Sequence, residues 1–142
     1  MKLNNANKKI ALQACSKFAG LSADAISLLA ATAETELYQA GEDIFSYGET
    51  SDRAYVIVSG EVDIYIPHKA EPVRTLPTGE LFGEYGLFAS QRSAGARAKT
   101  ETVLLSIEYS RFRACLFEAP QVMYRLFDVT VKRLIDLEGR QS

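Results

Sequence analysis

Hydrophobic and polar positions change their spacing twice along the chain, which divides it into three parts. Residues 1–34 favour helices, because apolar side chains stand among good helix formers and Ser22 precedes an apolar run, where an N-cap is expected. Residues 35–107 show short period-two or β-branched segments that glycines interrupt, and residues 108–142 are helical in pattern again. We therefore expect one domain over residues 1–142, in the order helix, β-roll, helix.

The clearest strands lie in the middle part. Residues 55–58 are apolar throughout, and in residues 62–66 the side chains of Val62, Ile64 and Ile66 share one face because strand side chains alternate. Glycines recur at intervals of about a strand plus a turn. This pattern predicts a mainly β fold with flanking α-helices, built as a double-stranded β-helix or jelly-roll-like barrel.

The last part predicts a short amphipathic helix over residues 111–117 and then a long one, because Pro120 suits the first position of a helix. Beyond Pro120, apolar residues recur at three- and four-residue steps as far as Leu137. A helix with so wide an apolar stripe packs against its own domain on one side and a partner on another.

Composition narrows the class of protein. The 142 residues are 47% hydrophobic and 24% charged, as in an ordinary globular domain. The net charge of −2 gives no support to nucleic-acid binding, and no apolar run approaches the ~18–20 residues that cross a bilayer. The start of the chain has no signal-peptide core. Cys15 and Cys115, without a CxxC spacing, predict reduced thiols in a cytoplasmic protein.

The sequence offers little to a catalytic centre. The single histidine, His68, lies in a polar stretch where an exposed loop is expected, which disfavours zinc, non-haem iron and His-triad enzymes. The chain also has no P-loop or nucleophile-elbow motif. We predict that the chain is not an enzyme and uses no metal or other cofactor.

One segment, residues 79–94, has the features of an anion site. A strand ends at Phe82, Gly83 allows a sharp turn, and the following helical turn offers free N–H groups. Glu84 and Arg92 flank that turn, where a carboxylate can accept a sugar hydroxyl and a guanidinium matches phosphate oxygens. The combination suits a phosphorylated sugar, although the spacing alone also fits a solvated ion pair.

Residues 82–94 resemble the phosphate-binding cassette of cyclic nucleotide-binding domains, specifically that of the bacterial catabolite activator and cAMP receptor protein family. The family pattern is Phe-Gly-Glu, a few apolar or small residues, a variable loop and Arg-Ser/Ala-Ala, and the chain reads FGEYGLFASQRSA. A second match is the first barrel hairpin, with the spacing Gly-x3-Asp-x2-Tyr-x-Ile-x2-Gly at Gly48, Asp52, Tyr55, Ile57 and Gly60. The resemblance covers roughly residues 18–137.

The resemblance implies roles for individual residues. Gly83 and Glu84 are expected at the ribose, with Glu84 accepting a hydrogen bond from the 2′-hydroxyl, and Arg92 is expected to pair with the phosphate. Ser93 and Ala94 are expected to donate hydrogen bonds from the Ser93 hydroxyl and from backbone N–H groups. Three barrel-wall residues are expected either to contact the ligand or to be plain core: Ile64, Val73 and Leu76. Two residues on the last helix, Arg133 and Leu137, are expected to face the purine.

The chain departs from the family pattern at a few positions. Gln91 stands where proline is common, and Gly86 replaces a commoner small or bulky apolar residue, but neither position supplies a group to the ligand. Leu137 and Glu138 stand where the catabolite activator helix offers small hydroxyl residues to adenine. Glu138 could accept hydrogen bonds from guanine, whereas the Arg-Ser-Ala sequence, in place of Arg-x-Thr, favours cAMP over cGMP.

These features predict a sensor that binds a cyclic mononucleotide and moves a C-terminal helix, hinged near residues 117–120, to signal to an unidentified protein effector. In the family that helix is the lid over the base and, in the catabolite activator group, the homodimer interface. The alternative is a structural dimerisation domain that keeps the roll and binds no nucleotide. The sequence contains no helix-turn-helix, second copy or membrane helix. We therefore expect no DNA or membrane binding by this chain, and either a stand-alone sensor or part of a longer protein.

Overall fold

The computed structural model describes residues 2–87 and 89–119, and within them eight strands lie between helical segments at both ends, with one short helical segment between the sixth and seventh strands. Their order is α1 (Asn5–Ala14), η1 (Ser16–Phe18), α2 (Ala23–Thr32), β1 (Glu34–Tyr38), β2 (Asp43–Phe45), β3 (Arg53–Ser59), β4 (Val62–Tyr65), β5 (Arg74–Leu76), β6 (Leu81–Phe82), η2 (Glu84–Leu87), β7 (Gly95–Ala98), β8 (Thr102–Glu108) and α3 (Tyr109–Glu118), where η marks a 3-10 helix.

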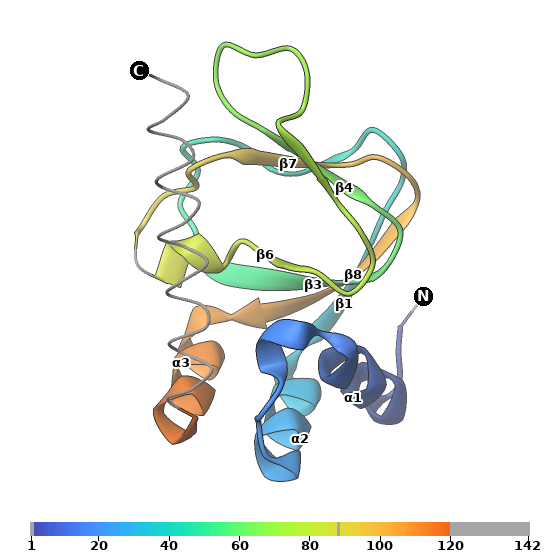
Figure 1. Cartoon of the computed structure of the whole chain (residues 1–142), viewed down its shortest axis with the longest axis vertical. Helices are drawn as coiled ribbons and strands as arrows, with labels where there is room; N and C mark the ends of the chain where they lie inside the picture. Colours follow the sequence, from blue (N-terminus) through green and yellow to red (C-terminus); the bar gives the residue numbers. More distant parts are fainter. Residues whose placement is uncertain (1, 88, 120–142) are drawn as a thin grey trace.

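The strands form two antiparallel four-stranded sheets that face each other across the roll (Figure 1). One sheet has the order β1-β8-β3-β6 and the other the order β2-β7-β4-β5, so both sheets combine strands distant in the sequence. Helices α1, α2 and α3 lie on the outer side of the first sheet (Figure 1). The predicted mainly β, jelly-roll-like fold with flanking helices is confirmed, while the predicted long C-terminal helix lies outside the described residues.

Strand β3 is a wall shared by two hydrophobic cores. Ala54 and Val56 belong to the core between the first sheet and the helices, whereas Tyr55 and Ile57 belong to the core between the two sheets. This division follows from the alternation of side chains along a strand. Successive residues of β3 therefore belong to different hydrophobic cores.

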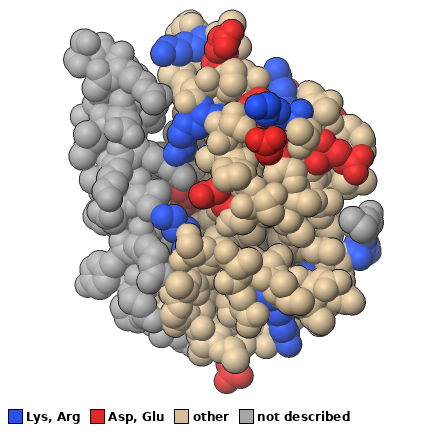
Figure 2. Space-filling model, turned by 45° about the vertical axis from the view of Figure 1, so that its right-hand side comes forward, with Lys and Arg blue, Asp and Glu red and all other residues tan. Residues whose placement is uncertain are grey.

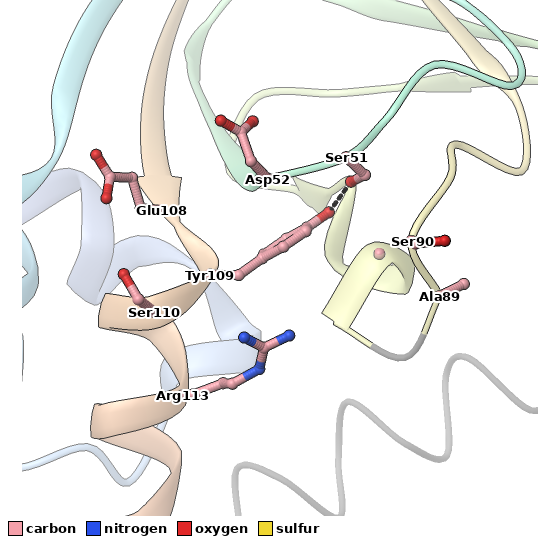
Figure 3. Close-up of a pocket in the computed structure, with 9 residues that line it drawn as sticks. Ser51, Asp52, Ala89, Ser90, Glu108, Tyr109, Ser110 and Arg113 are labelled. Atoms are coloured by element: carbon pink, nitrogen blue, oxygen red, sulfur yellow. Dashed lines mark hydrogen bonds between the residues drawn. The ribbon is translucent and has the colours of Figure 1, made fainter.

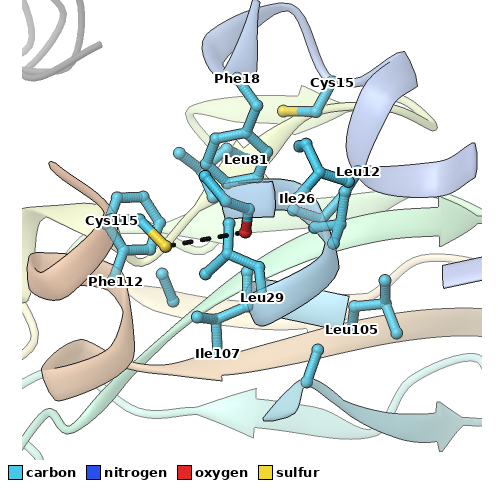
Figure 4. Close-up of a cluster of buried hydrophobic side chains, with 14 of the residues drawn as sticks. Leu12, Cys15, Phe18, Ile26, Leu29, Leu81, Leu105, Ile107, Phe112 and Cys115 are labelled. Carbon is cyan, nitrogen blue, oxygen red and sulfur yellow. Dashed lines mark hydrogen bonds between the residues drawn. The ribbon is translucent and has the colours of Figure 1, made fainter. Parts of the chain in front are cut away.

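The core beneath the helices is closed by apolar side chains from both ends of the described chain (Figure 4). The rings of Phe18 and Phe112 lie 5.5 Å apart, which joins η1 to α3. Cys15 and Cys115 are reduced, buried thiols in this core, and burial is the main cause that raises the pKa of Cys15. None of the helices in the described part of the chain is long and apolar enough to span a bilayer.

Local sequence signals set most of the element boundaries. Ser22 caps α2 as predicted, since its hydroxyl accepts a hydrogen bond from the Ala25 N–H at 3.1 Å. The predicted helix over residues 111–117 is also present, but it begins two residues earlier, at Tyr109. His68 is exposed in the loop after β4, as expected.

Two turn glycines with similar backbone angles have different surroundings. Gly60, between β3 and β4, has φ +96°, and a Cβ there would lie 2.5 Å from both the Glu101 carbonyl oxygen and Thr102 Oγ1. Gly79, before β6, has φ +93°, and a Cβ there would have no atom within 4 Å. An alanine at Gly79 would therefore cause backbone strain alone, whereas an alanine at Gly60 would cause both strain and steric overlap.

We predict that Gly60→Ala destabilises the domain more than Gly79→Ala. At Gly79 the cost is backbone strain alone, about 1–2 kcal/mol in the free energy of unfolding. At Gly60 the added methyl group also meets backbone atoms, which adds about 1–3 kcal/mol. Urea denaturation of both variants and the wild type measures the difference, and equal midpoints for the two variants would contradict the packing of this turn.

Candidate functional site

The backbone around Arg92 is held by the loop that precedes β3. The Arg92 N–H donates to the Glu49 carbonyl at 2.8 Å, and the Gly48 N–H donates to the Arg92 carbonyl at 2.9 Å. One step further, the Ser51 N–H donates to the Ser90 carbonyl at 2.9 Å. These bonds pair residues 90–92 with residues 48–51, which fixes the point from which the Arg92 side chain enters the protein.

The guanidinium of Arg92 is buried and surrounded by uncharged groups. The residue is only 6% exposed, and its Cζ lies 4.0 Å from the centre of the Phe45 ring. Nη1 donates to the Gly83 carbonyl at 3.2 Å and to the Tyr109 hydroxyl at 3.0 Å, and Nη2 donates to the Arg53 carbonyl at 2.9 Å. Among the residues that the structure describes, no carboxylate forms an ion pair with Arg92.

These contacts do not use all the hydrogen-bond donors of the guanidinium. An arginine carries five N–H donors, two on Nη1, two on Nη2 and one on Nε. The three contacts within residues 2–87 and 89–119 involve Nη1 and Nη2 and account for at most three of these hydrogens. The Nε–H and at least one further N–H therefore have no acceptor among the described residues, and two N–H groups on one edge, such as the edge that Nε and Nη2 share, can bind two oxygens of one anion.

The turn after β6 brings a carboxylate to the same place. Gly83 has φ +77°, and a Cβ there would lie 3.0 Å from Arg92 Nη1, so the position requires both the conformational freedom and the small size of glycine. Glu84 follows as the first residue of η2 and is 1% exposed. The sharp turn and the helical turn predicted after Phe82 are thus confirmed.

Sequence reasoning missed Tyr109, the first residue of α3. Its hydroxyl contacts Ser51 Oγ (Figure 3) and also donates to the Gly83 carbonyl at 2.5 Å. Burial is the main cause that raises the pKa of Tyr109, which keeps its hydroxyl protonated and able to donate. A Cβ at Gly86 would collide with the side-chain oxygens of Tyr109 and Ser51. The glycine at 86, an unusual residue for its position, was the only sequence signal of this contact.

The predicted barrel-wall residues lie together on the inner side of the roll. Ile64 and Leu76 are buried in the core between the sheets, and Val73 and Ala94 pack against that core. Ser93, between Arg92 and Ala94, is exposed. The same core contains three aromatic rings whose contacts the sequence did not predict, with centroids 5.2 to 6.0 Å apart: Phe45, Tyr55 and Phe82. Arg133 and Leu137 lie outside the described residues.

A polar cavity of about 590 Å³ lies on the other side of Tyr109, between η2 and α3 (Figure 3). It does not include any of the predicted ligand-binding residues, and its lining is Ser51, Asp52, Gly86, Ala89, Ser90, Glu108, Tyr109, Ser110 and Arg113. On the surface seen in Figure 2, basic and acidic side chains are interspersed. The described residues contain no cluster of three or more metal-ligating side chains.

Comparison with known proteins matches this arrangement to one family. A family model described as "Cyclic nucleotide-binding domain" matches residues 35–119. The cyclic AMP receptor protein of Thermus thermophilus is 33% identical over 127 residues, which are 85% of this chain and 59% of that protein. A cAMP-dependent protein kinase regulatory subunit of Emericella nidulans is 32% identical over 93 residues, or 65% of this chain and 23% of that protein.

A solved structure agrees with these matches. The catabolite activator protein of Thermus thermophilus superposes with a TM-score of 0.74 and 29% identity, covering 88% of this chain and 61% of that one. This chain spans little more than half the length of its Thermus relative. The two curated relatives are a receptor and a regulatory subunit, so the prediction of a regulatory domain rather than an enzyme is confirmed. Since the family model covers more than half of its residues, the chain belongs to the cyclic nucleotide-binding domain family.

Proposed function

We propose that this chain binds a cyclic mononucleotide, cAMP in preference to cGMP, through its phosphate-binding cassette. The observation that carries the proposal is the buried guanidinium of Arg92, whose partners among the described residues are two carbonyls, a phenol and an aromatic ring. A buried charge is costly unless an opposite charge compensates it. The single negative charge of a cyclic phosphodiester at the Nε–Nη2 edge would supply that compensation.

The residues around Arg92 suit the rest of such a ligand. Gly83 and Glu84 are proposed to contact the ribose, with the Glu84 carboxylate accepting from the 2′-hydroxyl. Ser93 and Ala94, next in sequence to Arg92, are proposed to donate to the phosphate from the Ser93 hydroxyl and from backbone N–H groups. The inner wall is proposed to contact the sugar and base through Ile64, Val73 and Leu76, and the last helix to face the purine through Arg133 and Leu137.

Ligand occupancy is proposed to act by a shift between two arrangements of the cassette. Because η2 carries Glu84, ligand binding would favour one position of this short helix over another. The movement would pass to α3 and then to the C-terminal helix, through which we propose a homodimer forms and a protein effector is contacted. The names of the relatives support cAMP as the ligand, and two reduced, buried thiols support a cytoplasmic location.

We predict that Arg92→Ala weakens cAMP binding at least about tenfold, because removing one partner of a buried charge pair costs about 2–5 kcal/mol. Isothermal titration of cAMP measures the change, and circular dichroism with urea denaturation reports whether the variant folds. Arg92→Lys provides a second variant that keeps the charge but lacks a two-donor edge.

Arg97→Ala is the matched control for this prediction. Arg97 is exposed and pairs with Asp43 at 2.9 Å, so its removal also deletes one arginine, but outside the proposed site. Its affinity for cAMP should remain within about twofold of wild type, since an exposed ion pair contributes little. Equal titration curves for folded Arg92→Ala, Arg92→Lys and wild type would refute the role of Arg92.

We predict that Glu84 sets a preference for the ribose 2′-hydroxyl. The wild type should bind cAMP more tightly than 2′-deoxy-cAMP, because the deoxy compound lacks the hydroxyl that donates a hydrogen bond to the Glu84 carboxylate. In Glu84→Ala the ratio of the two dissociation constants should fall close to one, and a ratio within one protein is insensitive to a general loss of stability. If the ratio of the two dissociation constants were the same in Glu84→Ala as in the wild type, Glu84 would not contact the ribose.

We predict that cAMP raises the melting temperature of the wild type. A ligand that binds only the folded state adds about 2.7 kcal/mol to its stability at a hundredfold excess over Kd. Thermal-shift measurements with cAMP and cGMP in parallel test both binding and base preference, with cAMP expected to give the larger shift. A melting temperature that neither compound changes at millimolar concentration would instead favour a structural dimerisation domain.

A further inference from the structure

The hydroxyl of Tyr109 uses its whole hydrogen-bonding capacity around Arg92. A phenolic oxygen has one hydrogen to donate and two lone pairs to accept with. The hydrogen goes to the Gly83 carbonyl, and Arg92 Nη1 can only donate to the oxygen. Ser51 Oγ, the third contact, must therefore donate to the second lone pair. This assignment gives each of the three groups one defined role.

Tyr109 is also held in place at both of its ends. Its backbone N–H donates to the Asp52 carbonyl at 2.9 Å, and its hydroxyl is bound by Ser51, the residue before Asp52. Gly86 lies so close that a Cβ there would be 2.8 Å from Tyr109 Cζ and closer still to the hydroxyl oxygen. With 5% exposure, the ring has little room to change rotamer.

We infer that Tyr109 is the positioning residue of the anion site. By binding Nη1, together with the Gly83 carbonyl, it orients the guanidinium of Arg92 so that the Nε–Nη2 edge is left for a phosphate. Because Tyr109 begins α3, it also makes the orientation of Arg92 depend on the position of that helix. The inference rests on the proposed function and names the residue that sets the geometry of its arginine.

The test is Tyr109→Phe, which removes one oxygen and keeps the ring. The Kd for cAMP should rise about tenfold, as expected for the loss of a hydrogen bond to a charged group. In an Arg92→Ala background, titrated to millimolar cAMP, the same change should alter the Kd less than about twofold, because residues that act through one contact are not additive. A residue that only stabilises the fold would give the same loss in both backgrounds.

Two further variants separate this contact from general effects. Gly86→Ala should reproduce the loss of affinity, since the nearest atoms to its added methyl group belong to Tyr109 and Ser51, and Tyr109 must move to make room. Tyr65→Phe is the matched control, because Tyr65 is a half-buried tyrosine whose ring lies 4.9 Å from Cζ of another arginine, Arg97. The control should bind cAMP as the wild type does. Urea denaturation of each variant measures its stability separately.

A ligand-free measurement distinguishes failure of this inference from failure of the proposed function. In ¹⁵N spectra of arginine side chains, the held Nη1 group of Arg92 should give resolved signals in the wild type and averaged ones in Tyr109→Phe. Unchanged signals, or equal Kd values for wild type and Tyr109→Phe, would overturn the role of Tyr109 and leave cAMP binding intact. If the wild type binds no cyclic nucleotide, the proposed function is wrong, and the spectra alone decide whether Tyr109 orients Arg92.

Discussion

The burial of one guanidinium is the constraint around which this domain is arranged. Arg92 is a long, charged side chain enclosed beside the face of Phe45, and only backbone carbonyls and a phenol hold it among the described residues. Each of these partners requires a specific local structure. Gly83 must adopt a left-handed turn for its carbonyl to face Arg92 without a side chain in between, and residues 48–51 must pair with residues 90–92.

The chemistry of those partners decides whether the site can bind and release an anion. A carboxylate would bind the guanidinium more strongly than a neutral acceptor does, often through two parallel hydrogen bonds, and would cancel its charge. Neutral oxygens orient the same group and leave its positive charge uncompensated. A site built in this way favours the binding of an anion from solution. That anion can leave again, whereas a carboxylate of the chain itself would stay beside the arginine.

Local patterns in the sequence predicted what local physics determines. The strands at residues 55–58 and 62–65, the cap at Ser22 and the glycine turn at Gly83 each depend on a few neighbouring residues, and all were found as expected. The contacts of Phe45 with Tyr55 and Phe82 were not predicted, because Phe45 lies on one sheet and the other two rings lie on the sheet that faces it. The spacing of residues along the sequence does not indicate which faces of the two sheets will pack together.

Tyr109 shows the same limit at the site itself. Its hydroxyl meets groups that lie 17, 26 and 58 positions away in the sequence, at Arg92, Gly83 and Ser51. No helical or strand period connects such separations, and a tyrosine at the start of a helix is ordinary. The informative residue was instead Gly86, where the absence of a side chain records the space that Tyr109 fills. Gly86 has no positive φ that would require glycine, so its lack of a side chain is explained by the close packing of Tyr109 against it. Tyr109 in turn connects the proposed ligand site to helix α3.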